Sequence, residues 1–220
     1  MGIQLPRHED IDQTGDRELD SLIRCHYLPF VRIFYRKRIQ MVLSLLPSNQ
    51  IDRLLDAGYG AGLFFPELFR RCRQLHGVDL HPFTVAKRMA ERSDLKAHLT
   101  RGDLLSLNYT DGSVDAVVSS SVLEHLRALP AALSEIHRVL KGGGIAVLGF
   151  PVKNRITKLL FRLIGFDDDT IHPSGHQDIL REIPRRFEVE AVRQFPPLVP
   201  MNFALYVVVR LRKRNQIRCQ

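Results

Sequence analysis

Aspartates and glycines recur where short apolar runs end, an arrangement suited to binding a ligand. The first run ends in Asp56, and Gly58, Gly60 and Gly62 follow it. Glycines at such a turn adopt positive φ angles and let a ligand approach the backbone. An aspartate beside them would repel a pyrophosphate, so the loop suits a ligand that carries positive charge and amino groups.

Two more aspartates extend this pattern. Asp79 lies 23 residues after Asp56, and Asp103 follows Gly102. In a doubly wound fold, an acid at the end of the second strand accepts hydrogen bonds from ribose hydroxyls. Asp103 would accept a hydrogen bond from an adenine amino group, with Leu104 stacked on the ring. Each aspartate alone is also typical of a turn or a helix N-cap, but all three at successive strand ends favour a nucleoside site.

These residues need a scaffold that brings strand ends together. Short apolar runs alternate with helical patterns through the middle of the chain, which predicts a parallel sheet covered by helices on both faces. We expect strands at 53–57, 75–78, 96–100, 114–119, 145–150, 187–192 and 203–211. Helices are expected at 62–72, from Pro82, and up to Leu140, where three glycines would end the last one. The ligand would bind at the carboxyl edge of this sheet.

Two variable segments flank this pattern. Residues 1–50 divide into a polar leader and a helical cap at 22–46, with a kink or break at Pro29. Residues 51–220 form the main domain, with an insertion at about 151–184. Within the insertion, 153–166 is a basic amphipathic stretch. It is either a lid helix packed on its own sheet or a contact for phosphates or an anionic membrane surface.

The ordered motifs of residues 50–150 resemble those of the class I S-adenosylmethionine-dependent methyltransferases, in the branch of the ubiquinone/menaquinone C-methyltransferases. Tyr59 departs from the family, which more often has a small residue or Cys at this loop position. The segments that carry the resemblance are 54–62 (LLDAGYGAG), 77–79 (GVD), 102–104 (GDL), 114–126 (VDAVVSSSVLEHL) and 138–144 (RVLKGGG).

The resemblance implies a Rossmann-like α/β fold with seven strands in the order 3-2-1-4-5-7-6, strand 7 antiparallel. It implies S-adenosyl-L-methionine as cofactor, S-adenosyl-L-homocysteine as product, and in-line methyl transfer to a small-molecule or lipid-linked acceptor. The expected cofactor-binding residues are Asp56, Gly58, Tyr59, Gly60, Gly62, Asp79, Leu80, Asp103, Leu104, Ser119 and Ser120. Ser119 and Ser120 would face the sulfonium end.

Two histidines are candidates for catalysis or acceptor contact. His125 follows the fourth expected strand, and His176 lies in the insertion. Each is also typical of a histidine tied to its own backbone or loop. His172 and His176 have a spacing used by metal sites, but Pro173 and Gly175 disfavour a continuous helix and no third ligand is close in sequence. We therefore expect no metal.

Charge and cysteines bear on partners and location. Residues 151–220 carry 13 basic and 7 acidic side chains, so +6 of the net +8 lies there. This leaves a nucleic-acid-binding or nucleic-acid-modifying protein as the alternative function, although 119–122 (SSSV) lacks the motif of enzymes that methylate amino groups of bases. A scaffold without catalysis is disfavoured by the intact Asp79 and Asp103. Three dispersed cysteines and no long apolar run predict a cytoplasmic protein, with a peripheral membrane contact through 153–166 left open.

Overall fold

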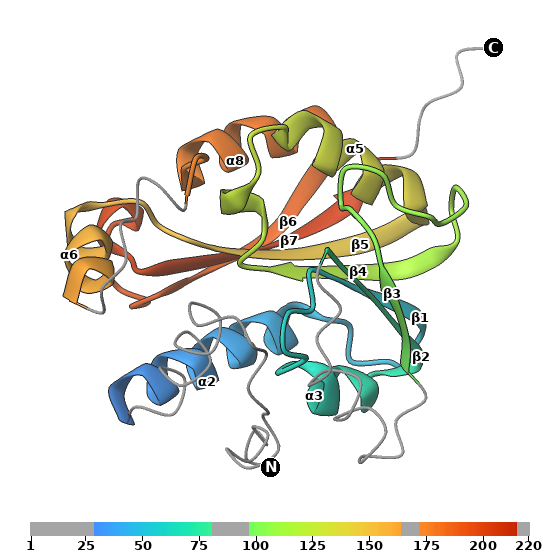
Figure 1. The fold of residues 1–220 in the computed structure, drawn as a ribbon, viewed down its shortest axis with the longest axis horizontal. Helices are drawn as coiled ribbons and strands as arrows, with labels where there is room; N and C mark the ends of the chain where they lie inside the picture. The colour runs from blue at the N-terminus through green and yellow to red at the C-terminus, as the bar shows by residue number, and fades with distance from the viewer. Residues whose placement is uncertain (1–28, 81–96, 164–171, 215–220) are drawn as a thin grey trace.

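A seven-stranded sheet runs through the computed structural model, which describes residues 29–80, 97–163 and 172–214 (Figure 1). The strand order is β3-β2-β1-β4-β5-β7-β6. Neighbouring strands run parallel except β7, which is antiparallel to both β5 and β6. The strands are β1 (Ile51–Ala57), β2 (Cys72–Asp79), β3 (Ala97–Arg101), β4 (Val114–Ser120), β5 (Leu140–Pro151), β6 (Phe187–Phe195) and β7 (Tyr206–Lys213). The expected order and the antiparallel strand are confirmed.

The register of the central strands brings the predicted site residues together. Asp56, near the end of β1, lies level with Gly77 of β2 and with Val118 of β4. Because parallel strands end at one edge, the segments that follow them share that edge. β1 is buried continuously from Leu54 to Ala57, as expected of a strand segment covered on both faces, whereas Asp52 at its start is exposed.

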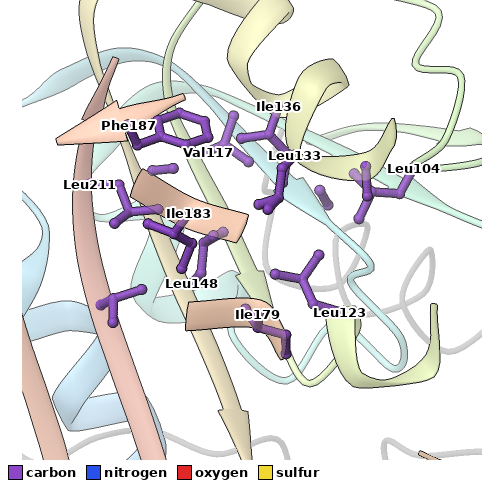
Figure 2. Close-up of a cluster of buried hydrophobic side chains, with 14 of the residues drawn as sticks. Leu104, Val117, Leu123, Leu133, Ile136, Leu148, Ile179, Ile183, Phe187 and Leu211 are labelled. Carbon is purple, nitrogen blue, oxygen red and sulfur yellow. The ribbon is translucent and has the colours of Figure 1, made fainter. Parts of the chain in front are cut away.

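Helices cover both faces of the sheet (Figure 1). The helices are α2 (Pro29–Leu45), α3 (Phe65–Phe69), α5 (Leu129–Val139), α6 (Arg155–Leu163) and α8 (His176–Glu182), with short 3-10 turns η2 (Leu123–His125), η3 (Ile183–Arg185) and η4 (Met201–Phe203). One buried apolar cluster lies between the sheet and α5 with α8 (Figure 2). A second includes Ile39 and Val42 of α2 and Phe65 of α3. Cys72 is a buried free thiol there.

Two helix predictions were wrong in extent. α3 is only five residues long, because β2 begins already at Cys72 and the backbone N–H of Ile51 donates to the carbonyl of Arg71, 2.8 Å away. α5 ends at Val139, before the three glycines, which lie inside β5. Gly143 has φ +71°, and the β4–β5 register shifts between Val114 and Ala116. The glycines therefore form an irregular strand start rather than a helix stop.

Helix α6 does not pack its apolar face on the sheet, so the expectation of a packed lid helix is corrected. Ile156, Leu159 and Leu160 are 43–58% exposed. Thr157 of the same helix is buried, and its hydroxyl donates to the carbonyl of Val152 at 2.6 Å. This polar anchor fixes the rotation of the helix and turns the apolar side chains outward.

No helix in the described ranges is both long and apolar enough to cross a membrane. The last strand is shifted from its expected bounds of 203–211, because β7 begins at Tyr206 and continues through Lys213. Several expected features lie outside the described residues: the leader, the start of the helical cap, the helix from Pro82, and positions 164–171 of the insertion. The described part of the cap is helix α2.

Candidate functional site

The loop after β1 has the backbone geometry that its glycines predicted. Gly58, Gly60 and Gly62 have φ angles of +86°, +51° and +70°, which side-chain-bearing residues rarely adopt. A Cβ on Gly58 would lie 2.1 Å from Cγ2 of Val122, whereas one on Gly60 would meet no atom within 4 Å. Gly58 thus lets the loop pack against the segment after β4, while the surroundings of Gly60 leave room for a ligand.

Asp79 fastens this loop to the end of β2. The backbone N–H of Gly60 donates to Oδ2 of Asp79 at 2.8 Å, and that of Gly58 donates to the carbonyl of Val78 at 2.7 Å. Leu80, the next residue, is 50% exposed. The predicted ribose-binding carboxylate and the glycine loop therefore form one unit.

Asp56 is buried at the same edge, with 3% of its surface exposed. Burial, together with the smaller effect of the nearby charge of Asp79, raises the pKa of its carboxyl from 3.8 to about 8. Two carboxyl groups held this close repel each other when both are ionised. A cationic group bound beside them would relieve that repulsion.

The Tyr59 side chain packs in the second core cluster, away from the loop surface. Its ring lies 5.6 Å from that of Phe65 (centroid to centroid) and within 2.7 Å of where a Cβ on Gly77 would be. Burial raises the pKa of Tyr59 to about 12, and its hydroxyl has no hydrogen-bond partner. Tyr59 therefore presents only its backbone to the loop surface, and its large side chain takes up no space there.

Replacing Tyr59 by Phe tests this placement. A buried hydroxyl without a partner costs stability, so Tyr59→Phe is expected to leave the free energy of unfolding unchanged or raise it by up to about 1 kcal/mol. Urea denaturation measures the change. The variant should bind S-adenosylhomocysteine as tightly as the wild type does. A tenfold weaker affinity of the variant would show that the hydroxyl contacts the ligand.

At the end of β3, the structure separates Asp103 from Leu104. The Asp103 carboxylate is half-buried, and its Oδ1 accepts a hydrogen bond from the backbone N–H of Leu105 at 2.9 Å. Leu104 is only 6% exposed and packs in the core cluster (Figure 2). The stacking of its side chain on an adenine ring stays a prediction, and in this structure that side chain faces the interior.

The two serines after β4 also have different surroundings. Ser119 is buried, and its hydroxyl donates to the carbonyl of Ala57 at 2.8 Å. It therefore ties β4 to the end of β1, and a contact of its side chain with a sulfonium stays a prediction. The Ser120 hydroxyl lies 2.9 Å from that of Tyr206. Ser121, at φ +59°, holds an unusual backbone conformation for a residue other than glycine.

A buried arginine from α2 meets these serines, and the sequence analysis missed it. Arg38 donates to the hydroxyls of Ser120 at 3.2 Å and Ser121 at 2.7 Å. Its guanidinium carbon lies 4.6 Å from the ring centroids of Tyr35 and Tyr206. Arg38 is 7% exposed, yet its Nε–H has no acceptor. Arg38 is four residues from both Phe34 and Val42, a spacing that places it on the inward face of the helix. Because it belongs to the basic run 36–38 (RKR), it resembles a solvent-exposed cation in the sequence.

The candidate histidines occupy unlike environments. His125 is exposed in η2, directly after the buried Glu124. His176 is 4% exposed, and its Nδ1 accepts a hydrogen bond from the backbone N–H of Lys153 at 3.1 Å. Burial lowers the pKa of His176. Burial raises the pKa of Glu124, while nearby His125, His172 and Arg38 oppose this shift.

The chain matches known methyltransferases over the segment that holds this edge. Residues 55–148 match a family described as methyltransferase domain. A probable S-adenosylmethionine-dependent methyltransferase of Mycolicibacterium smegmatis is 32% identical over 66% of this chain and 52% of its own. A ubiquinone/menaquinone biosynthesis C-methyltransferase of Dinoroseobacter shibae is 28% identical over 70% of this chain and 64% of its own. The chain spans about half the length of several curated relatives it matches.

Solved structures share the fold. The PH0226 protein of Pyrococcus horikoshii has a TM-score of 0.67 at 20% identity, covering 86% of this chain and 95% of that one. The [4+2]-cyclase SpnF has a TM-score of 0.66 at 20% identity, covering 80% of each chain. These likenesses concern architecture, and a fold by itself does not fix a reaction. The sequence matches place residues 55–148 in a methyltransferase-domain family, and the chain is similar there to S-adenosylmethionine-dependent methyltransferases that include a ubiquinone/menaquinone C-methyltransferase.

Proposed function

We propose that this protein transfers a methyl group from S-adenosylmethionine to a small-molecule acceptor, lipid-linked acceptors included. The observation that carries the proposal is the unit of Asp56, the glycine loop and Asp79 at the carboxyl edge of the sheet. The cofactor's amino group and sulfonium are cationic, and the two carboxyl groups of this unit suit such a ligand.

The residues present fit this cofactor. The loop from Asp56 to Gly62 would hold its methionine part, with space above Gly60. Asp79 would accept hydrogen bonds from the ribose hydroxyls, and Asp103 one from the adenine amino group. When bound, the cofactor supplies a methyl group on a sulfonium, which an acceptor nucleophile can displace. The task of the protein is to orient the two partners and exclude water.

The acceptor end of the site would lie at Ser120, Ser121 and Arg38. A buried guanidinium whose Nε–H lacks an acceptor favours a substrate with an anionic or oxygen-rich group. His125, which is exposed, can remove a proton from an acceptor hydroxyl or contact the acceptor. His176 is the weaker candidate, because it is buried and its Nδ1 already accepts a hydrogen bond.

Helix α6 supports an acceptor with a hydrophobic or lipid part. Ile156, Leu159 and Leu160 are exposed, and α6 also carries exposed cations, among them Arg155 and Lys158. An exposed apolar stripe beside cations is typical of a surface that meets lipid. Among curated relatives, one acts on demethylmenaquinone and another on a malonyl-[acyl-carrier protein], by their names.

The nucleic-acid alternative loses support in β7. Arg210 and Arg212 both bind Glu190, and each also donates to a backbone carbonyl, of Leu45 and Gly143 respectively. Lys213 donates to the carbonyl of Leu140 at 2.6 Å. These cations join β7 to its neighbours β5 and β6 and to α2. Fewer cations of the C-terminal third are therefore available to bind phosphates than its net charge suggested.

A transfer assay tests the proposal. The protein is incubated with methyl-labelled S-adenosylmethionine and, separately, a small-molecule extract, a lipid extract and total RNA. We expect label in the small-molecule or lipid fraction, and at least tenfold less with Asp79→Asn. The control Asp52→Asn alters an exposed acid near the start of the neighbouring strand β1, away from the carboxyl edge, and should transfer normally. Label that enters only RNA would contradict the proposal.

A further inference from the structure

Three metal-ligating side chains meet beside the proposed acceptor end, although they come from separate parts of the chain. Glu124 and His125 belong to η2, after β4, and His172 lies in the segment before α8. Their ligand atoms all lie within 4.8 Å of one another. Glu124 and His172 are buried, while His125 is exposed.

Hydrogen bonds hold the two segments together. The backbone N–H of Ser174 donates to the carbonyl of Glu124 at 3.2 Å, and the Ser174 hydroxyl donates to the carbonyl of Leu126. Lys153 Nζ donates to the carbonyl of His172 at 3.0 Å. The rings of His125 and His172 lie 4.8 Å apart between centroids. These hydrogen bonds hold the backbones that carry the three side chains in fixed positions relative to each other.

One ligand atom in this cluster lacks a partner. Oε2 of Glu124 is buried and accepts no hydrogen bond, and the residue as a whole is 2% exposed. A buried carboxylate oxygen without a partner is costly and needs an explanation. A bound cation would supply the missing interaction.

We propose that Glu124, His125 and His172 bind a divalent transition-metal ion. Two imidazoles and one carboxylate suit zinc, manganese, iron or cobalt better than magnesium, which prefers oxygen ligands. Ligand atoms around a tetrahedral zinc stand about 3.3 Å apart, given metal–ligand lengths of about 2.0–2.1 Å. To reach this spacing from separations of up to 4.8 Å, the ligand atoms must move closer together by side-chain rotation, which the exposed His125 can make. This ligand set was not predictable from residue spacing, since only folding places Glu124 and His125 beside His172.

Three protein ligands leave a coordination position open, as in catalytic metal sites. Glu124 interacts electrostatically with Arg38, which bonds to Ser120 and Ser121, so the open position would border the acceptor end. There the ion would bind an oxygen of the acceptor and polarise it. This role rests on the proposed function, and His125 as a ligand would not act as a base; the metal site itself rests on neither.

Calorimetry on chelator-treated protein tests the site with ZnCl2, MnCl2 or MgCl2 alone, and the visible absorption of added CoCl2 reports the ligand set. We expect one zinc or cobalt ion per chain and weaker binding of magnesium. Glu124→Gln, His172→Gln and His125→Gln should each weaken zinc binding at least tenfold. His125 is exposed, so its replacement keeps the test valid even if the two buried variants fold poorly.

The matched control is His98→Gln. His98 is an exposed histidine of β3, and its ring stacks on that of His76 in β2 at 4.9 Å between centroids. It should bind zinc as the wild type does. The proposal is overturned if the wild type binds no ion, if His125→Gln binds as tightly as the wild type, or if His98→Gln loses binding equally. All folded variants should still bind S-adenosylhomocysteine, so failure of the metal site and failure of the proposed function are distinguishable.

Discussion

Replacing Asp56 by Asn is expected to stabilise the ligand-free protein above pH 7 and to weaken its binding of S-adenosylhomocysteine. Burial and the charge of Asp79 hold the pKa of Asp56 at about 8 in the folded chain. At neutral pH the wild type therefore bears the cost of a buried acid that the unfolded chain ionises freely. Asn removes this cost, about 2–4 kcal/mol. It also removes the charge that would bind the ligand's ammonium group, so affinity should fall roughly 10–100-fold.

The pH dependence follows from the direction of this shift. Between about pH 4 and pH 8, the folded protein keeps a proton on Asp56 that the unfolded chain has released. Stability contributed by this group is therefore fully present below pH 4 and declines as pH rises, by up to about 1.4 kcal/mol per pH unit. Ligand binding should instead tighten from pH 6 to pH 8, as Asp56 ionises.

Urea denaturation and calorimetry at pH 6, 7 and 8 check both effects, and Asp56→Asn should flatten both profiles. Asp52→Asn is the control, since it alters an exposed acid of the same strand that forms a surface ion pair with Arg73. A variant at position 56 that loses stability at pH 8, or binds ligand as the wild type does, would show that Asp56 does not face the ligand as a buried acid.

Replacing Arg38 by Met is expected to destabilise the protein by about 2–4 kcal/mol. The change removes the donor to Ser120 and Ser121 and one of the positive charges near the buried Glu124. Removing one partner of a buried charged network usually costs this much, because the other remains uncompensated. Chemical denaturation measures the loss.

Lys37→Met is the matched control, because Lys37 is the exposed neighbour of Arg38 on α2. It should change stability by less than about 0.5 kcal/mol. The double variant Arg38→Met, Glu124→Gln should recover part of the lost stability, because position 124 then carries no charge that needs Arg38 as a partner. Equal effects at positions 37 and 38 would contradict the buried network.

Features encoded within a few residues were predictable from the sequence. The glycine loop, Asp56 and Asp79 lie where strands end, and a parallel sheet necessarily gathers such ends at one edge. The strand order and the antiparallel β7 came from the family resemblance, and the structure confirms both.

Side-chain direction and long-range contact were not predictable. Tyr59 and Leu104 lie in motifs of the site, yet both turn into the core, which the motif letters do not encode. Arg38 lies 82 residues from Ser120, and each appears ordinary in its own segment. The glycines at 142–144 suit a helix end as well as an irregular strand start, and the pairing of β5 with its neighbours decided between these.

The most direct test of the central claim is thermal unfolding with and without S-adenosylhomocysteine, for the wild type, Asp79→Ala and Asp52→Asn. Ligand at 100 times its dissociation constant adds about 2.7 kcal/mol to the stability of a protein that binds it. For a chain of this size, Tm should rise by about 5–11 °C. We predict this rise in the wild type and in Asp52→Asn and its loss in Asp79→Ala. No rise in the wild type, or an equal rise in Asp79→Ala, would contradict a cofactor site built on the glycine loop and Asp79.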